Sequence, residues 1–222
     1  MQVCKYCGQL KTLVKSHIIP RSFCEIKSFG IYDDELFCKD CEDKFMLYDA
    51  YAFQILNEQS SHRKALTDQQ GQVLGAYYET YDYNKLKLFF MSVLLRAGLS
   101  DVFFFKHVKV EPYLELLKDA VDAGQAPVAN DFAVFLAYYD ELKKGPIMFP
   151  PAQKRIKKIK FYHFHIGQVI FYIKVDRRDT PEELQPIILQ PSGKLFLIRF
   201  GLKDPNDFDI LQGIERIHHG IE

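Results

Sequence analysis

Two pairs of cysteines with the same short spacing constrain this chain more than any other feature. Cys4 and Cys7 form one C-x-x-C pair, and Cys38 and Cys41 form a second. A C-x-x-C turn aims two thiolates at one point, and two such turns complete the tetrahedral shell of a structural zinc ion. Buried, apolar cysteines are the alternative, which the spacing disfavours. The sequence therefore predicts a zinc ion with four thiolate ligands and no open position for water.

The composition predicts a globular protein with a substantial core. The chain has 222 residues, 48% of them hydrophobic, with 19 Phe and 13 Tyr. The fifth cysteine, Cys24, lies outside both pairs, and an odd count without a secretory leader favours a reducing, cytoplasmic setting. The most apolar run, 86–95, is far shorter than the ~20 residues that span a bilayer. We therefore expect a cytoplasmic protein without a membrane segment.

The spacing of apolar residues predicts an α+β fold. We expect a zinc-binding module over 1–60 and an accessory α+β domain over 61–222, with helices to about 145, β-hairpins at about 156–200 and a C-terminal helix. Helices are expected over 42–56, 83–99, 111–121 and 207–217, and hairpins over 156–175 and 187–200. Residues 132–138 are expected to form a strand or a helix, and the polar residues 60–72 a linker or an exposed loop.

Charge is balanced overall but unevenly distributed. Formal net charge is zero, so a nucleic-acid partner would need a local basic surface. Residues 31–60 carry eight acids against two Lys or Arg, whereas residues 151–180 carry eight Lys or Arg against two acids. A run of cations in the second stretch is a candidate substrate-binding surface, although a solvated strand face explains it equally simply: Lys154, Arg155, Lys157, Lys158 and Lys160.

Two further groups are candidates for chemistry. His17 precedes Ile18, Ile19 and Pro20, which favour a rigid extended segment, and an imidazole can take a proton from water near pH 7. Arg96 lies inside an apolar helix, where its charge needs a partner. We expect it to pair with an acid such as Glu42 or Asp49, or to bind a substrate phosphate.

The first 50 or so residues resemble the HNH endonuclease superfamily, the ββα-metal nucleases. Its zinc-bearing members carry a C-x-x-C pair, an Asp-His-Ile-(Ile/Val)-Pro stretch, an Asn, and a second C-x-x-C followed by His. In this chain the corresponding segments read V-C-K-Y-C-G, S-H-I-I-P-R-S-F and L-F-C-K-D-C-E. The whole pattern is similar to a bacterial subgroup of short HNH-like proteins.

The resemblance implies a role for each matching residue. The four cysteines would hold the structural zinc, in a treble-clef arrangement, and His17 would be the general base. Glu42 falls where the family has its last metal-binding His, and Asp33 falls near the motif Asn, with Asp34 beside it. Ser16 replaces the family's Asp. With these residues the resemblance implies catalytic Mg²⁺ or Mn²⁺ in addition to zinc.

Two functions follow as expectations. The first is a metal-dependent endonuclease that hydrolyses phosphodiester bonds in DNA or RNA, most readily in DNA. By resemblance alone such a protein would serve in bacterial phage defence, with a protein partner from the defence system. The second is a catalytically inactive zinc module that binds nucleic acid or a protein, which Ser16, Glu42 and the acidic 31–60 stretch favour.

Overall fold

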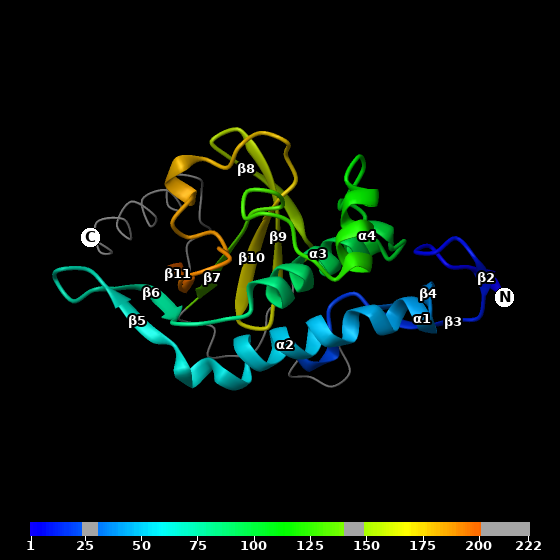
Figure 1. Cartoon of the computed structure of the whole chain (residues 1–222), viewed down its shortest axis with the longest axis horizontal. Helices are drawn as coiled ribbons and strands as arrows, with labels where there is room; N and C mark the ends of the chain where they lie inside the picture. The colour runs from blue at the N-terminus through cyan, green and yellow to red at the C-terminus, as the bar shows by residue number, and fades with distance from the viewer. Residues whose placement is uncertain (24–30, 140–148, 201–222) are drawn as a thin grey trace.

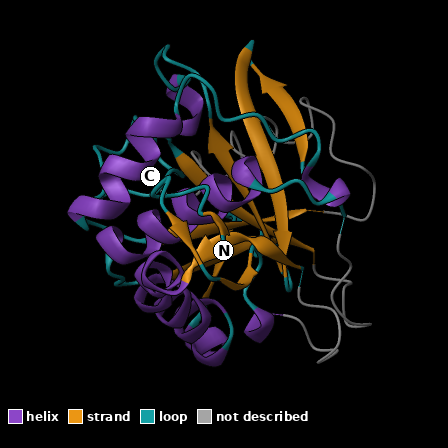
Figure 2. Ribbon diagram, turned by 90° about the vertical axis from the view of Figure 1, so that its right-hand side faces the viewer, coloured by secondary structure: helices purple, strands orange, loops and turns teal. Residues whose placement is uncertain are grey.

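The fold of the chain is given by a computed structural model, which describes residues 1–23, 31–139 and 149–200. It is an α+β protein in which helices gather on one side of a large sheet (Figures 1 and 2). The expected fold class is therefore confirmed at this level. The expected C-terminal helix over 207–217 lies outside the described residues.

The large sheet has seven strands in the order β5-β6-β11-β7-β10-β9-β8. Every neighbouring pair is antiparallel except β11 and β7, which run parallel. The strands are β5 (Lys64–Thr67), β6 (Val73–Tyr78), β7 (Val134–Tyr139), β8 (Ala152–Ile156), β9 (Ile159–Ile166), β10 (Val169–Lys174) and β11 (Leu195–Phe200).

One long helix, α3 (Tyr83–Leu99), forms the centre of the core, with the bounds that the apolar pattern predicts. Asp82 caps its N-terminus by accepting from the Lys85 amide at 2.9 Å, and every residue from Leu86 to Ala97 is buried. A helix that is buried all round must be covered on all sides. Helices α2 (Met46–Leu56) and α4 (Leu114–Ala123) and strand β10 cover it.

Both faces of the sheet are buried, which explains why β10 is apolar at consecutive positions. Phe171 packs on Phe90 of α3 with ring centroids 4.6 Å apart, while Tyr172, on the opposite face, stacks on Phe135 at 4.5 Å. The predicted 156–175 hairpin is confirmed as β9–β10, with Gly167 at a φ of 58° in its turn.

The predicted second hairpin over 187–200 is wrong. Only its second half is a strand: β11 pairs with β6 and β7, which are distant in sequence. Ile187, Ile188 and Leu189 follow the 3₁₀ helix η5 (Glu182–Leu184) and lie with 1–2% exposure; the first two pack on the outer face of the sheet. Their apolar character comes from covering that face, not from strand pairing.

The polar stretch over 60–72 is also not a plain linker. It contains the end of the 3₁₀ helix η3 (Glu58–His62) and strand β5, which pairs with β6 at the sheet edge. In β5 only Leu66 is buried, because an edge strand leaves most of its side chains in water. Because most of these side chains face water, the segment is rich in polar residues.

The cysteine-bearing segment is built from short elements at one end of the molecule (Figure 1). They are β1 (Gln2–Val3), β2 (Leu10–Lys11), β3 (Leu13–His17), η1 (Arg21–Phe23), β4 (Tyr32–Cys38), α1 (Lys39–Glu42) and η2 (Asp43–Phe45). Strands β3 and β4 pair antiparallel. The helix expected over 42–56 is thus three consecutive helical pieces: the end of α1, then η2, then α2.

This segment shares a core with the rest of the chain. One cluster of buried side chains runs from Cys4 and Phe37 through α3 to Leu197 of the sheet. Tyr6 donates its hydroxyl to Asp122 of α4 at 2.8 Å. The described residues of the zinc-binding module expected over 1–60 therefore pack directly on the helices that follow.

Candidate functional site

The four paired cysteines come together as their spacing predicts. One ligand atom from each of Cys4, Cys7, Cys38 and Cys41 lies within 4.8 Å of the others. Such a cluster can bind a metal ion such as zinc. Gly8, with a φ of 70°, donates to the Cys4 carbonyl at 2.8 Å and closes the first turn. Cys38 ends β4 and stands just before α1, which carries Cys41, so the second pair lies at a helix start.

The chemistry of the cluster fits a cation. Burial alone would raise the pKa of Cys4, but the backbone amides of Cys7, Cys38 and Tyr6 donate to its sulfur and lower it to about 7. Burial, followed by contacts with neighbouring thiols, raises the pKa of Cys41. Four thiols this close cannot all ionise without a positive ion among them, because like charges repel. The donor set is the one that zinc prefers.

Glu42, the residue after Cys41, brings a carboxylate to the end of β3. Its Oε1 accepts a hydrogen bond from the backbone N–H of His17 at 3.2 Å. Its other oxygen, Oε2, is buried and has no hydrogen-bond partner among the described residues. The nearby Ser16 hydroxyl donates to the Val14 carbonyl at 3.4 Å. Burial raises the pKa of Glu42, and the charge of Arg96 is the largest effect opposing that rise.

His17 is partly buried at the C-terminal end of β3. Its ring meets Tyr32 edge-on, with centroids 6.3 Å apart. Burial lowers the pKa of His17, as do the positive charges of Lys15, Arg96 and Arg21. The imidazole is therefore neutral at pH 7. Among the described residues, the hydrogen bond that joins His17 to Glu42 comes from the backbone amide of His17.

Of the two roles expected for Arg96, the structure shows the ion pair with an acid. Its guanidinium is fully buried and binds Asp49 of α2 through two bonds of 2.7 and 2.9 Å. It also donates to the His17 carbonyl at 2.7 Å and to Ser92 of its own helix. These five bonds use all five donor protons of the group. Arg96 is therefore not a substrate-binding residue in this arrangement.

The two aspartates of β4, Asp33 and Asp34, lie in different environments. Asp33 is buried, and its carboxylate accepts from the Glu35 amide at 2.9 Å and from the Ser100 hydroxyl at 2.7 Å. It ties β4 to the C-terminal end of α3. Asp34 is exposed, since successive residues of a strand point to opposite faces. Asp33 is thus a structural residue, and these two side chains do not form a shared ligand pair.

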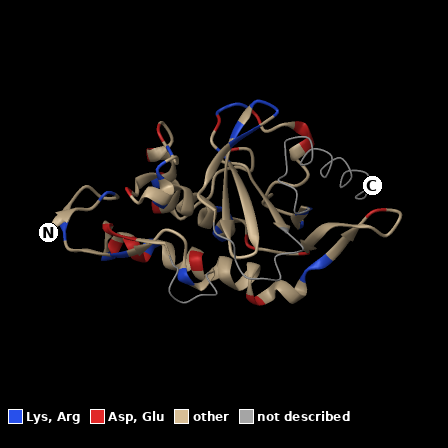
Figure 3. Cartoon of the chain, turned by 180° about the vertical axis from the view of Figure 1, so that it is seen from behind, with Lys and Arg blue, Asp and Glu red and all other residues tan. Residues whose placement is uncertain are grey.

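The basic run forms the β8–β9 hairpin at the edge of the large sheet, away from α1 and β3 (Figures 1 and 3). Lys157 and Lys158 make its two-residue turn with φ values of 49° and 68°. This left-handed conformation usually selects Asn-Gly and costs a lysine about 1–2 kcal/mol. Arg155, Lys157 and Lys158 are exposed, while Lys154 and Lys160 are partly buried. Lys157 pairs with Glu183 at 2.9 Å.

Comparison with protein-family models, curated proteins and solved structures finds no match to this chain in any of the three. Among the described residues, no helix is both long enough and apolar enough to cross a membrane.

We predict that purified protein contains one zinc ion per chain, because the four cysteine sulfurs form a closed thiolate shell. Elemental analysis of protein prepared without added metal measures this. Cys38→Ser should lower the zinc content and unfold the cysteine-bearing segment, since zinc supplies folding free energy there. Cys24→Ser, which lies outside both pairs, is the control and should keep full zinc. A folded protein without zinc would contradict the assignment.

Proposed function

We propose that the chain is a metal-dependent endonuclease of the HNH type, in which a zinc-stabilised treble-clef module hydrolyses phosphodiester bonds in nucleic acid. The observation that carries this proposal is the contact between Glu42, the last residue of α1, and the backbone amide of His17. The carboxylate of Glu42 has one oxygen bonded to the His17 amide and a second, buried oxygen with no hydrogen bond of 3.5 Å or less among the described residues, while the Ser16 side chain lies close enough to lower the pKa of the carboxyl. A buried carboxylate oxygen of this kind is suited to a hard divalent cation.

The local topology supports the same proposal. Strands β3 and β4 and the helix that begins after Cys38 follow one another in the order strand, strand, helix. His17 ends the first strand, and Glu42 lies in the helical turn that Cys41 anchors. A Cys₄ zinc site keeps no open coordination position, so zinc would hold this geometry and take no part in the reaction.

Within the proposed site each residue has a separate task. Glu42 would hold Mg²⁺ or Mn²⁺, which when bound would neutralise charge on the scissile phosphate. His17, neutral at pH 7, would accept the proton of the attacking water. Arg96 would act as a positioning residue by fixing the His17 carbonyl. Asp33 would fix β4 through Ser100.

The basic β8–β9 hairpin is the proposed substrate contact of the rest of the chain. Exposed cations release counterions when they bind phosphates, and this release contributes to affinity without reading sequence. The turn at Lys157 and Lys158 favours this role, because two lysines occupy positions where their backbone conformation is unfavourable. DNA is the first substrate to test, and RNA the second.

A second candidate function is a catalytically inactive zinc module that binds nucleic acid or a protein partner. The observation that favours it is that both Glu42 and Asp33 accept backbone amide hydrogen bonds, which gives each carboxylate a structural use. In that case the cysteine cluster and the Arg96 network would serve folding alone.

Cleavage of supercoiled plasmid separates the two functions. We predict that zinc-loaded protein nicks plasmid with Mg²⁺ or Mn²⁺, and that His17→Ala and Glu42→Gln each lower the rate at least about a hundredfold, as the loss of a general base does. Glu42→Gln keeps an oxygen that can accept from the His17 amide, so it removes charge with little change in packing. Exposed Asp34→Asn is the matched control.

Activity that survives both His17→Ala and Glu42→Gln would rule out this site as the catalytic centre. An inactive wild-type protein that still binds nucleic acid would support the second function. Circular dichroism and zinc content of each variant establish that the fold is intact.

The proposed role of the β8–β9 hairpin predicts how the affinity for DNA depends on salt concentration. Replacing Lys157-Lys158 by Asn-Gly removes two charges and suits the turn better, so we expect the hairpin to stay folded although the Lys157–Glu183 ion pair is lost. We expect the plot of log affinity against log salt for duplex DNA to flatten by about 1.8, at about 0.9 for each lost phosphate contact. Fluorescence anisotropy at several salt concentrations measures the slope. An unchanged slope would assign the run to an ordinary solvated turn.

A further inference from the structure

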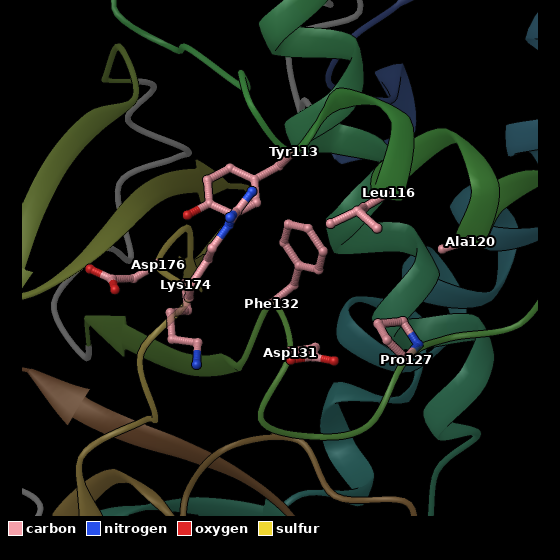
Figure 4. Close-up of a pocket in the computed structure, with 9 residues that line it drawn as sticks. Tyr113, Leu116, Ala120, Pro127, Asp131, Phe132, Lys174 and Asp176 are labelled. Carbon is pink, nitrogen blue, oxygen red and sulfur yellow. The ribbon is translucent and has the colours of Figure 1, made fainter.

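A cavity of about 340 Å³ lies far from the cysteine cluster in sequence, between α4, the loop before β7 and the end of β10 (Figure 4). Its volume is within the range of small-molecule sites, ~300–1,000 Å³. One side of the lining is apolar and the other is charged. The lining includes Tyr113, Leu116, Asp131, Phe132, Asp176 and Arg177.

The aromatic wall of the cavity is held in a strained conformation. Phe132 has a φ of 48°, which is unfavourable for a bulky side chain and places it in the left-handed region. Its ring meets Tyr113 edge-on with centroids 5.7 Å apart, and Figure 4 shows both rings at the cavity. Strain of this kind persists only where the surroundings enforce it, and it gathers at ligand sites.

The loop that carries Pro127, Asp131 and Phe132 is fixed by several hydrogen bonds. Tyr83 donates to the Pro127 carbonyl at 2.6 Å. The buried amine of Lys87, on α3, donates to the Ala129 carbonyl at 3.1 Å. Lys174 donates to the Asn130 side chain at 3.3 Å and to the Arg178 carbonyl at 2.7 Å. The cavity is therefore preformed, which lowers the cost of ordering it around a ligand.

The charged side offers one acceptor and one donor. The carboxylate of Asp131 and the guanidinium of Arg177 both line the cavity and are solvent-exposed, and neither forms an ion pair with another described residue. Asp176 is already bound by Arg178 at 2.7 Å and by the Lys160 amide at 3.1 Å. Asp131 also lies close enough to Lys87 and Lys174 to act on their charges, but it and Arg177 are the exposed charged groups of the lining that form no ion pair with a described residue.

We propose that this cavity binds a small aromatic molecule that carries both an N–H donor and an anionic group. The ring would pack against Phe132, Tyr113 and Leu116, the donor would meet Asp131, and the anion would meet the guanidinium of Arg177, whose fork fits carboxylate and phosphate alike. Two sources share this chemistry: nucleoside monophosphates with an amino-bearing base, and aromatic amino acids. The site is separate from the proposed nuclease centre and does not depend on it.

Titration calorimetry with the full zinc-loaded chain tests the proposal. The probes are AMP, GMP and CMP with their parent nucleosides, and phenylalanine and tyrosine with the matching amines, phenethylamine and tyramine. We expect at least one probe of one class to bind 1:1 at millimolar or lower concentration, and its uncharged or decarboxylated counterpart to bind about tenfold more weakly, the factor for a lost charged hydrogen bond. The class of probe that binds, nucleotide or aromatic amino acid, identifies the ligand.

Arg177→Gln should weaken that binding by about tenfold without unfolding the chain, since its side chain is exposed. Phe132→Leu should weaken it as well by removing the ring. Arg155→Gln, an exposed arginine of the basic hairpin that does not line the cavity, is the matched control and should leave binding unchanged. No binding by any probe, or equal weakening by Arg155→Gln and Arg177→Gln, would overturn the proposal.

Discussion

The buried ion pair between Arg96 and Asp49 is the interaction on which the rest of the cysteine-bearing segment depends. Arg96 lies in the middle of the core, where an unpaired charge is costly. It therefore fixes the position of α2 through Asp49 and of β3 through the His17 carbonyl. These hydrogen bonds all come from the rigid, planar guanidinium of Arg96. They therefore fix the position of β3, which ends at His17, relative to α2, which carries Asp49.

The cysteine cluster and Arg96 constrain the same small region from the two ends of β3. The cysteine cluster joins the first turn of the chain to the end of β4 and the start of α1. Arg96 then holds the far end of β3 to the helices. Glu42 lies between these two anchors, next to Cys41 and bonded to the His17 amide. A carboxylate held in this way loses little conformational entropy when it meets a cation, which favours a preorganised site.

Features that depend on local spacing could be predicted from the sequence. The C-x-x-C spacing predicted the cysteine cluster, and helical periodicity predicted α3 with its bounds. The isolated charge of Arg96 among apolar residues predicted a carboxylate partner, and Asp49 was one of the two acids expected there.

Features that depend on long-range pairing could not be predicted. Strand β11 inserts between β6 and β7, and nothing within 187–200 reveals those partners. Asp33 matched the motif as a ligand, yet its carboxylate meets Ser100, 67 residues away in sequence. The cavity beside Phe132 has no sequence signal either, since its φ is set by packing around it. The roles of His17 and Glu42 in catalysis stay predictions.

A double-mutant cycle on Arg96 and Asp49 tests the central structural claim most directly. Urea unfolding of the zinc-loaded wild type, Arg96→Ala, Asp49→Ala and the double variant gives their coupling free energy. We predict a coupling of about 2–3 kcal/mol, because Asp49→Ala leaves the fully buried guanidinium of Arg96 without its carboxylate partner. The exposed pair Lys64–Glu79 is the control and should give less than about 1 kcal/mol. A coupling for Arg96 and Asp49 no larger than that of the control pair would contradict the account.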